Sequence, residues 1–294
     1  MKPDLTTVNS PGDRFTDFLA LTKPRLNSLV VVTSGVGYLA GRTEAVDLVP
    51  FLSTTIGAAL VAGGAAAFNQ LAERALDERM LRTRDRPLPG GRLQPAAATW
   101  FAIILVVTGL VQIGTGANLN AAAIALCTLV SYVWIYTPLK RRTHWAMLVG
   151  AVPGGLPVII GWAAAGPLSA AAWSLFALVF VWQLPHFLAL TWLYRDDFSK
   201  AGLPLLSVTD PTGRRGARHL LIYTTLLIPT SLAPAWLGIA GPSYSIGAGL
   251  LGIGLLAIAA WFARRRSTYR ARLLFKATLL YLPMMWVLLL ADGN

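Results

Sequence analysis

Long apolar stretches without Asp, Glu, Lys or Arg alternate along this chain with short charged segments. A helix that crosses the hydrocarbon core of a bilayer needs about 20 residues, and isolated strands cannot satisfy their backbone hydrogen bonds in lipid. The charge-free stretches are therefore predicted to form transmembrane helices. They cover residues 26–41, 48–72, 93–139, 143–194, 219–263 and 277–291.

Three of these stretches are long enough for two helices each. Turns are predicted where glycine, proline or asparagine interrupt the apolar pattern, at Gly114–Asn118, Gly166-Pro167 and Gly241–Ser243. The last stretch is short, and we expect its helix to begin near Leu273, with Lys276 extending toward the interface. The pattern thus predicts an all-α membrane protein, a bundle of nine transmembrane helices.

The basic residues are distributed very unevenly among the predicted loops. When the N-terminus is placed on one side of the membrane, that side receives every Lys and Arg except Arg42. Such an excess marks the cytoplasmic side, so nine spans predict a cytoplasmic N-terminus and an external C-terminus in a membrane such as the bacterial inner membrane. Residues 1–25 are expected to be a retained cytoplasmic tail rather than a signal peptide, and residues 26–294 a single intramembrane domain.

The composition agrees with the hydropathy pattern. Hydrophobic residues make up 55% of the 294 residues and charged residues only 13%, with a mean hydropathy of +0.59, whereas a soluble domain carries about 25% charged residues. A water-soluble globular protein is therefore excluded. One cysteine, Cys127, permits neither an intrachain disulfide nor a cysteine zinc site. The net charge of +12 is explained by the excess of Lys and Arg in the predicted cytoplasmic loops. No nucleic-acid partner is expected.

Three oxygen-bearing side chains follow one another at the end of the second predicted span. Asn69, Glu73 and Asp77 are spaced by four residues, which offsets each by only about 40° around a helix and spreads the three over about 12 Å of its axis. Oxygen ligands at a half-wet rim suit Mg²⁺, which is usually shared with substrate phosphates. The alternative is that these acids are only solvated or pair with Arg74 and Arg79.

A second acidic pair, Asp196 and Asp197, follows the sixth predicted span at the same side of the membrane. Two acidic clusters on different helices predict metal binding on both sides of a diphosphate, and either aspartate can supply the ligand. Arginine is suited to bidentate binding of phosphate oxygens, although the positive-inside bias alone also places cations here. The basic residues considered for substrate binding are Arg82, Arg84, Arg86, Lys140, Arg195 and Lys200.

His186 is the only histidine that lies well inside a predicted span, directly after Pro185. The proline removes one backbone hydrogen bond, and a polar group inside a membrane helix is a functional hypothesis by default. His186 lies about 15 Å deeper along its helix than Asp196. It is expected to face a substrate that reaches into the bundle, with a hydrogen bond to a neighbouring helix as the alternative.

Several motifs together resemble the UbiA-type intramembrane prenyltransferases, most closely the branch that acts on protoheme IX. The resemblance covers about residues 20–210, whereas the last three spans agree only in hydropathy. The family pattern commonly has Asp where this chain has Glu73. The motifs that carry the resemblance are Thr22–Arg25, Asn69–Asp77 with Met80, Arg82-Thr83 and Arg86–Leu88, Tyr136–Thr143 with Gly161-Trp162, Pro185–Phe187, Tyr194–Phe198 and Ala201–Pro204.

The resemblance implies Mg²⁺-dependent transfer of a farnesyl group from farnesyl diphosphate to a vinyl group of heme b, followed by water addition. It implies catalytic roles for Asn69, Asp77 and Asp197, and metal binding by these three together with Glu73 and Asp196. His186 is a candidate for binding heme iron or orienting the porphyrin. Lys23 and Arg25 are candidates for pairing with the heme propionates. Enzymes or assembly factors that use the modified heme would be downstream partners.

Two other functions remain open at this stage. The same ionisation chemistry would serve a prenyltransferase that acts on an aromatic quinone precursor. A membrane transporter is a further alternative, but transporters usually carry ionisable groups near the bilayer midplane. In this sequence the charged groups collect at one rim, which favours group transfer over transport.

Overall fold

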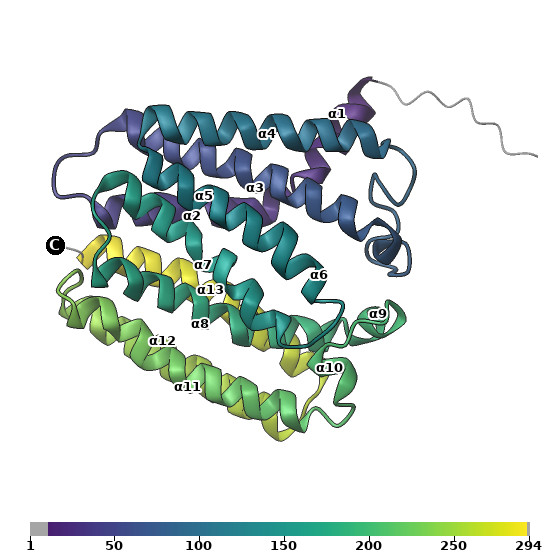
Figure 1. Ribbon diagram of the computed structural model, residues 1–294. Coiled ribbons are helices and arrows are strands. Elements are labelled where there is room, and N and C mark those ends of the chain that lie inside the picture. The colour runs from purple at the N-terminus through teal and green to yellow at the C-terminus, as the bar shows by residue number, and fades with distance from the viewer. Residues whose placement is uncertain (1–10, 293–294) are drawn as a thin grey trace, which may run out of the picture.

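The computed structural model describes residues 11–292, and it is all-helical over that range (Figure 1). The helices are α1 (Pro11–Leu21), α2 (Pro24–Gly41), α3 (Leu48–Asp77), α4 (Pro95–Gly116), α5 (Leu119–Val130), the π-helix η1 (Ser131–Tyr136), α6 (Thr137–Leu139), α7 (Ala146–Ala165), α8 (Ala170–Leu193), α9 (Arg195–Lys200), α10 (Leu206–Thr209), α11 (Arg214–Trp236), α12 (Pro242–Arg264) and α13 (Thr268–Asp292).

Local sequence signals set many of the helix ends. Proline lies in the first turn of α2, α4 and α12, where its missing N–H would be unpaired in any case. Asp47 accepts a hydrogen bond from the Val49 N–H at the start of α3, and Asn118 accepts one from the Ala121 N–H at the start of α5. Such caps satisfy backbone donors that the first helical turn leaves free. The predicted turn at Gly114–Asn118 is therefore confirmed.

Seven helices of the described chain are long and apolar enough to cross a membrane: α3, α4, α5 with its continuation to Leu139, α7, α8, α12 and α13. This confirms an all-helical integral membrane protein. Two other predicted spans, α2 and α11, form long helices alongside these seven, but their composition is less apolar. The charged connections before α4, around α9 and before α13 lie at one end of the bundle (Figure 1).

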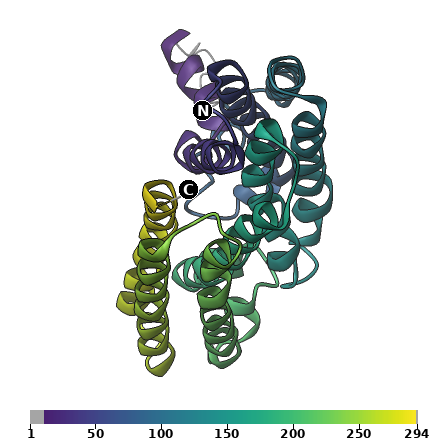
Figure 2. The same cartoon turned by 90° about the vertical axis from the view of Figure 1, so that its left-hand side faces the viewer.

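Helices α3 and α4 lie at one side of the bundle and α11 and α12 at the other, as Figures 1 and 2 show. Between them α2 packs closely against α7 at two glycines. A Cβ at Gly161 would lie 1.9 Å from the Ser34 carbonyl oxygen, and one at Gly37 would lie 2.1 Å from the Val158 carbonyl oxygen. No side chain fits at these two glycines, so the backbones of α2 and α7 come into direct contact. This contact sets the distance between the two helices.

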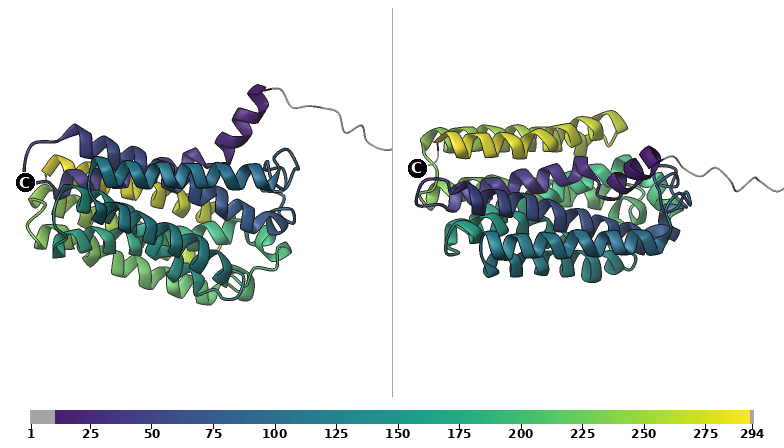
Figure 3. Two further views of the ribbon diagram at one scale, coloured as in Figure 1. Left: turned by 45° about the horizontal axis from the view of Figure 1, so that its top comes forward. Right: turned by 90° about the horizontal axis from the view of Figure 1, so that it is seen from above.

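Three features differ from the sequence-based expectations. Residues 11–21 of the expected tail form helix α1, whose Asp17 pairs with Arg92 at 3.0 Å, and residues 1–10 lie outside the described range. The fourth long span contains a π-helical turn, η1, before its last residues form α6, and the hydropathy pattern does not reveal this turn. The last helix begins at Thr268, five residues before Leu273. Figure 3 shows this helix, α13, along the outside of the bundle.

Candidate active site

The three oxygen-bearing side chains at the end of α3 are buried. Glu73 and Asp77 expose only 5% and 1% of their side chains, and Asn69 is buried as well. A buried carboxylate is stable only when a cation or hydrogen-bond donors neutralise its charge. The alternative, that these residues are only solvated at a helix end, is therefore wrong.

Two predicted binding residues provide those cations. Lys140, from the end of α6, forms an ion pair with Glu73. Arg86, from the loop after α3, places its Nη1 2.9 Å from Asp77 Oδ2. Thr83 of the same loop donates a hydrogen bond to the Asp77 carbonyl oxygen, which folds the loop back over the carboxylates. Neither carboxylate pairs with Arg74 or Arg79, and Arg74 instead contacts Glu78.

Lys23, the residue before α2, is the third cation that contacts these polar side chains of α3. Its Nζ donates to Asn69 Oδ1 at 3.2 Å, and Asn69 Nδ2 donates to Thr137 Oγ1 at 3.1 Å. Lys23 has left-handed backbone angles (φ 49°, ψ 60°), which cost energy for a non-glycine residue and cluster at functional sites. Burial, and then the nearby charge of Arg86, lower the pKa of Lys23 to about 8. We name the six residues Lys23, Asn69, Glu73, Asp77, Arg86 and Lys140 the rim cluster.

The second acidic pair separates into two different environments. Asp196 exposes 90% of its side chain and lies 3.7 Å from Arg195. Asp197 is half-buried, and its charge acts on Arg82, as does that of Asp77. The Arg82 guanidinium packs over the ring of Tyr194 at 4.9 Å. Burial and the charge of Arg86 lower the pKa of Arg82, while Asp197 and Asp77 act in the opposite direction. The charges of both acidic groups thus act on Arg82.

The other predicted binding residues lie elsewhere. Arg195 stacks on Trp192, with 4.6 Å from its Cζ to the ring centre. Lys200 is exposed at the end of α9, and Arg25 is exposed in the first turn of α2. The structure therefore brings Lys23, Arg82, Arg86 and Lys140 together and leaves Arg195, Lys200 and Arg25 outside this group.

A cavity of about 290 Å³ opens directly beneath the rim cluster. Its wall on α3 is formed by small residues, among them Ala58, Ala62 and Ala65. These residues continue the helical face that carries Asn69 and Glu73, because the spacings of three and four residues return to one side of a helix. The distance from Asn69 to Ala58 is about 16 Å along the axis. The same face of α3 thus carries buried charged residues at its C-terminal end and lines the apolar part of the cavity further along the helix.

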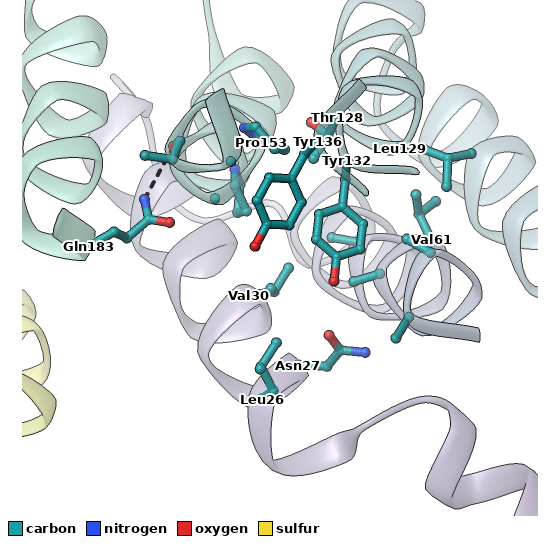
Figure 4. Close-up of a pocket in the computed structure, with 18 of the residues that line it drawn as sticks. Leu26, Asn27, Val30, Val61, Thr128, Leu129, Tyr132, Tyr136, Pro153 and Gln183 are labelled. Atoms are coloured by element: carbon teal, nitrogen blue, oxygen red, sulfur yellow. Dashed lines mark hydrogen bonds between the residues drawn. The ribbon is translucent and has the colours of Figure 1, made fainter. Parts of the chain in front are cut away.

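Two tyrosines from η1 project into the cavity (Figure 4). The rings of Tyr132 and Tyr136 stack with centroids 5.6 Å apart. Gln183 enters from α8 and donates through Nε2 to the carbonyls of Val179 and Ala151. Sequence reasoning did not select these residues as site residues. The sequence did offer a signal for Gln183, because it is an uncharged polar residue inside an apolar predicted span, three positions before His186.

His186 does not lie among the described residues that line the cavity. Its Nδ1 lies 2.9 Å from Thr278 Oγ1 on α13. The alternative of a hydrogen bond to a neighbouring helix is therefore confirmed, and His186 faces the boundary between α8 and α13.

The site can bind an anion next to an apolar chain. Four cations and two buried carboxylates meet at one end of a cavity whose other walls are largely apolar. Over residues 11–292, no three His, Cys, Asp or Glu side chains converge as a metal-binding group. Within the rim cluster, Asn69, Glu73 and Asp77 are the oxygen donors that could hold a divalent cation, which would need further oxygen ligands from outside this cluster.

Comparison with known proteins agrees with this geometry. Residues 30–289 match the UbiA prenyltransferase family. A protoheme IX farnesyltransferase of Solibacter usitatus is 44% identical, over 94% of this chain and 98% of that protein. A protoheme IX farnesyltransferase of Myxococcus xanthus is also 44% identical, over 94% of both chains.

Solved structures share the fold at lower sequence identity. A digeranylgeranylglyceryl phosphate synthase aligns with a TM-score of 0.79 at 18% identity, covering 95% of this chain and 98% of that chain. A UbiA homolog from Archaeoglobus fulgidus, solved with GPP and Mg²⁺ bound, aligns with a TM-score of 0.66 at 14% identity, covering 93% and 99% of the two chains.

Proposed function

Because this chain belongs to the UbiA prenyltransferase family, we propose that it transfers a farnesyl group from farnesyl diphosphate to a vinyl group of heme b. The observation that supports this most directly is the continuous face of α3, which joins buried carboxylates to an apolar cavity. A diphosphate with a long hydrocarbon tail has the same division into a charged head and an apolar chain. The heme acceptor is supported by the names of the relatives that are 44% identical over nearly the whole chain.

The donor set at the rim fits Mg²⁺. Asn69, Glu73 and Asp77 provide hard oxygen ligands. Asp197 is the candidate from the second acidic pair because it is half-buried and its charge acts on Arg82, whereas Asp196 is exposed to solvent. When bound there, Mg²⁺ would supply Lewis-acid neutralisation of the leaving diphosphate. Mg²⁺ held there would neutralise the two carboxylates in place of Lys140 and Arg86, and both cations would then be available to the diphosphate oxygens.

The protein's own cations stabilise the charge that develops as the carbon–oxygen bond to the diphosphate breaks. Arg86 and Arg82 can form bidentate hydrogen bonds to phosphate oxygens, and Lys23 and Lys140 add compact charges at the mouth of the cavity. Preorganised charge in a site with little water is usually the largest catalytic contribution. We therefore assign these four residues to binding the leaving group.

The cavity holds the hydrocarbon chain and keeps water from the allylic cation. Burial of the chain is favourable by about 0.8 kcal/mol per CH₂ unit. The electron pair of the heme vinyl group then forms the new carbon–carbon bond at its terminal carbon. The cation that results lies next to the porphyrin, where a water oxygen adds and releases a proton. The product carries a hydroxyethylfarnesyl side chain.

We further propose the membrane arrangement that the cation distribution predicts. Helices α2 and α11 join the seven apolar helices to give nine spans in one domain over residues 26–294. The rim cluster lies on the cytoplasmic side of the bacterial inner membrane, and the C-terminus lies outside. The support is that the charged connections gather at one end of the bundle, together with the rim cluster.

The test is to incubate the purified protein with heme b, farnesyl diphosphate and Mg²⁺ and to analyse the pigment by mass spectrometry. The expected product has gained one farnesyl group and one hydroxyl group, and a chelator prevents its formation. Prenylation of an aromatic quinone precursor, with heme b left unmodified, would show that the acceptor is wrong. Absence of both products in a folded, substrate-binding protein would refute the proposed reaction.

A further inference from the structure

The cavity beneath the rim cluster has a closed far end, and three helices place that end at a similar depth. Among the described residues that line the cavity, the deepest are Ala58 on α3, Ala125 on α5 and Ile160 on α7. Ala58 lies about 16 Å along the helix axis from Asn69, and Ala125 lies a similar distance from Tyr136. The three deep residues expose only 2%, 0% and 3% of their surface. The far end of the cavity therefore lies inside the protein and is covered on all sides.

Buried apolar side chains fill the space beyond this end. Ala125 and Ile160 also belong to a packed apolar group with Ile113 of α4, Ala121 of α5 and Ala163 of α7. We name these five residues the closing cluster. Three of the five are alanines, so Ile113 and Ile160 provide its large side chains. Ile160 contacts the cavity directly, whereas Ile113 belongs to the layer behind it.

Close contacts between helices hold the closing cluster in place. The Ile113 side chain lies against the backbone of α3, because a Cβ at Gly57 would lie 2.5 Å from Ile113 Cγ1. The same Cβ would lie 2.9 Å from the Gly109 carbonyl oxygen of α4. At the start of α5, Asn118 Nδ2 donates to the Ala163 carbonyl oxygen of α7 at 2.8 Å. Packing among four helices thus fixes the far end, and a longer ligand gains room there only when a side chain becomes smaller.

The depth of the cavity corresponds to three isoprene units. A prenyl chain has four chain bonds in each isoprene unit, and an extended chain advances about 1.2 Å per bond. Two, three and four units therefore extend over about 10, 14 and 19 Å. When the diphosphate lies at the rim cluster, a chain of three units reaches Ala58 and Ile160. A fourth unit would occupy the space that the closing cluster fills.

We propose that the closing cluster limits the prenyl donor to three isoprene units, with Ile160 as the residue that stops the chain and Ile113 as the second layer. This inference rests on the proposed function for the prenyl diphosphate donor, and it adds the residues that set the chain length. The competing path is lateral. Leu26 of α2 also lines the cavity and is 64% exposed, so a chain that passed Leu26 would leave toward the lipid and its length would not be restricted.

The experiment measures the binding of geranyl, farnesyl and geranylgeranyl diphosphate to the purified full-length protein in detergent, with Mg²⁺ and without heme. We expect the wild type to bind farnesyl diphosphate at least tenfold more tightly than either of the other two. The shorter chain buries less apolar surface, and the fourth unit of the longer chain finds no space. Equal binding of farnesyl and geranylgeranyl diphosphate would show that the chain leaves past Leu26 and would overturn the inference.

Substitutions can move the far end of the cavity in either direction. Ile160→Ala removes three carbons and is expected to reduce the discrimination against geranylgeranyl diphosphate at least threefold. Ile160→Ala combined with Ile113→Ala removes six carbons, slightly more than the five of one isoprene unit, and should reverse the preference in favour of geranylgeranyl diphosphate. Ala58→Leu fills the deep end and creates no void. It should weaken the binding of farnesyl diphosphate at least tenfold and leave that of geranyl diphosphate unchanged.

Ile159→Ala is the matched control for Ile160→Ala. Ile159 is 1% exposed and precedes Ile160 on α7, but it belongs to a different apolar group and is not among the described residues that line the cavity. The control removes the same three carbons from the core and should leave the preference for farnesyl diphosphate unchanged. Equal changes of preference in Ile159→Ala and Ile160→Ala would assign the effect to a general loosening of the core and would overturn the inference.

Turnover with heme b, measured on the same variants, separates this inference from the proposed reaction. An unchanged preference for farnesyl diphosphate in Ala58→Leu and Ile160→Ala, with both variants folded by thermal unfolding, overturns the inference even when farnesylated heme still forms. A chain-length preference that follows the substitutions in a protein that makes no farnesylated heme supports the closing cluster and refutes the reaction instead.

Discussion

The rim cluster and the cluster around His186 show two different ways to bury polar groups in one membrane protein. The rim cluster contains full charges, and each carboxylate is paired with a cation, Glu73 with Lys140 and Asp77 with Arg86. The deeper cluster around His186, where α8 packs on α13, contains neutral groups joined by hydrogen bonds that end at Thr278. Buried charges are stable only when paired, whereas neutral groups need only hydrogen bonds.

This difference suggests that the two clusters have different roles. Ion pairs at the rim can exchange partners when a divalent cation and a diphosphate arrive, because the same residues can neutralise the new charges. The neutral cluster has no such exchange available and holds one imidazole in one orientation. We therefore expect variants at the rim to respond to Mg²⁺, and variants in the deeper cluster to be indifferent to it.

The largest expected effect is on turnover in Asp77→Asn. The change replaces one buried carboxylate with a neutral amide of the same shape, so the site loses a ligand for the Mg²⁺ that would neutralise the leaving diphosphate. Removal of one preorganised electrostatic group typically costs about 10²–10³ in kcat, and we expect a loss of that size. Product formation from heme b and farnesyl diphosphate measures it.

Thermal unfolding in detergent is the control for Asp77→Asn, because the partner Arg86 exposes 27% of its side chain and can turn toward water. Wild-type turnover in this folded variant would remove the rim cluster from the mechanism.

Next in size is the stability of Lys140→Met without Mg²⁺. Glu73 then loses its partner while it remains buried, and breaking a buried ion pair costs about 3–5 kcal/mol. Added Mg²⁺ should restore part of this loss, since it can neutralise Glu73 in place of the amine. The measurement is the unfolding midpoint of variant and wild type, each with Mg²⁺ and with a chelator. A variant that is as stable as the wild type in the chelator would show that the ion pair is not structural.

The two neighbouring aspartates of α9 form a matched pair for the third prediction. Asp197→Asn is expected to reduce turnover by about 10- to 100-fold, because Asp197 is half-buried, its charge acts on Arg82, and one transition-state contact is worth a few kcal/mol. Asp196→Asn should have almost no effect, since its side chain is 90% exposed. Equal losses in the two variants, or the reverse order, would contradict the assignment of Asp197.

Much of the architecture and of the rim cluster was predictable from the sequence, for identifiable physical reasons. The absence of charge over about 20 residues predicts a membrane helix, and the turns at the glycine and proline positions follow from backbone preferences. The four-residue spacing of Asn69, Glu73 and Asp77 predicts a shared face. That Lys140 and Arg86 pair with these acids depends on tertiary folding, so spacing could only list them among several cations.

The remaining features depend on contacts that one sequence does not encode locally. Asp196 and Asp197 are adjacent and chemically identical, and only their burial and the electrostatic effect of Asp197 on Arg82 distinguish them. Thr278 is one polar residue in an apolar run, and its importance emerges only when α13 packs on α8. The π-helical turn that directs Tyr132 and Tyr136 into the cavity has no periodicity signal, because it changes the helical register by one residue.

The smallest expected effect distinguishes the two clusters most sharply. Thr278→Val preserves the side-chain shape but removes the hydroxyl that pairs with His186 Nδ1 inside the bundle. Loss of one partner of a buried neutral hydrogen bond costs about 1–3 kcal/mol, and we expect the lower end because the Thr278 carbonyl still binds Trp182. The cost should be the same at low and high salt and with or without Mg²⁺, since no full charge is involved. Denaturant unfolding in detergent under these four conditions measures it, with Lys140→Met as the salt- and Mg²⁺-sensitive comparison. A Thr278→Val cost that changes with Mg²⁺ as strongly as that of Lys140→Met would mean that the deeper cluster is coupled to the rim, and the division between exchangeable charge and fixed hydrogen bonds would be wrong.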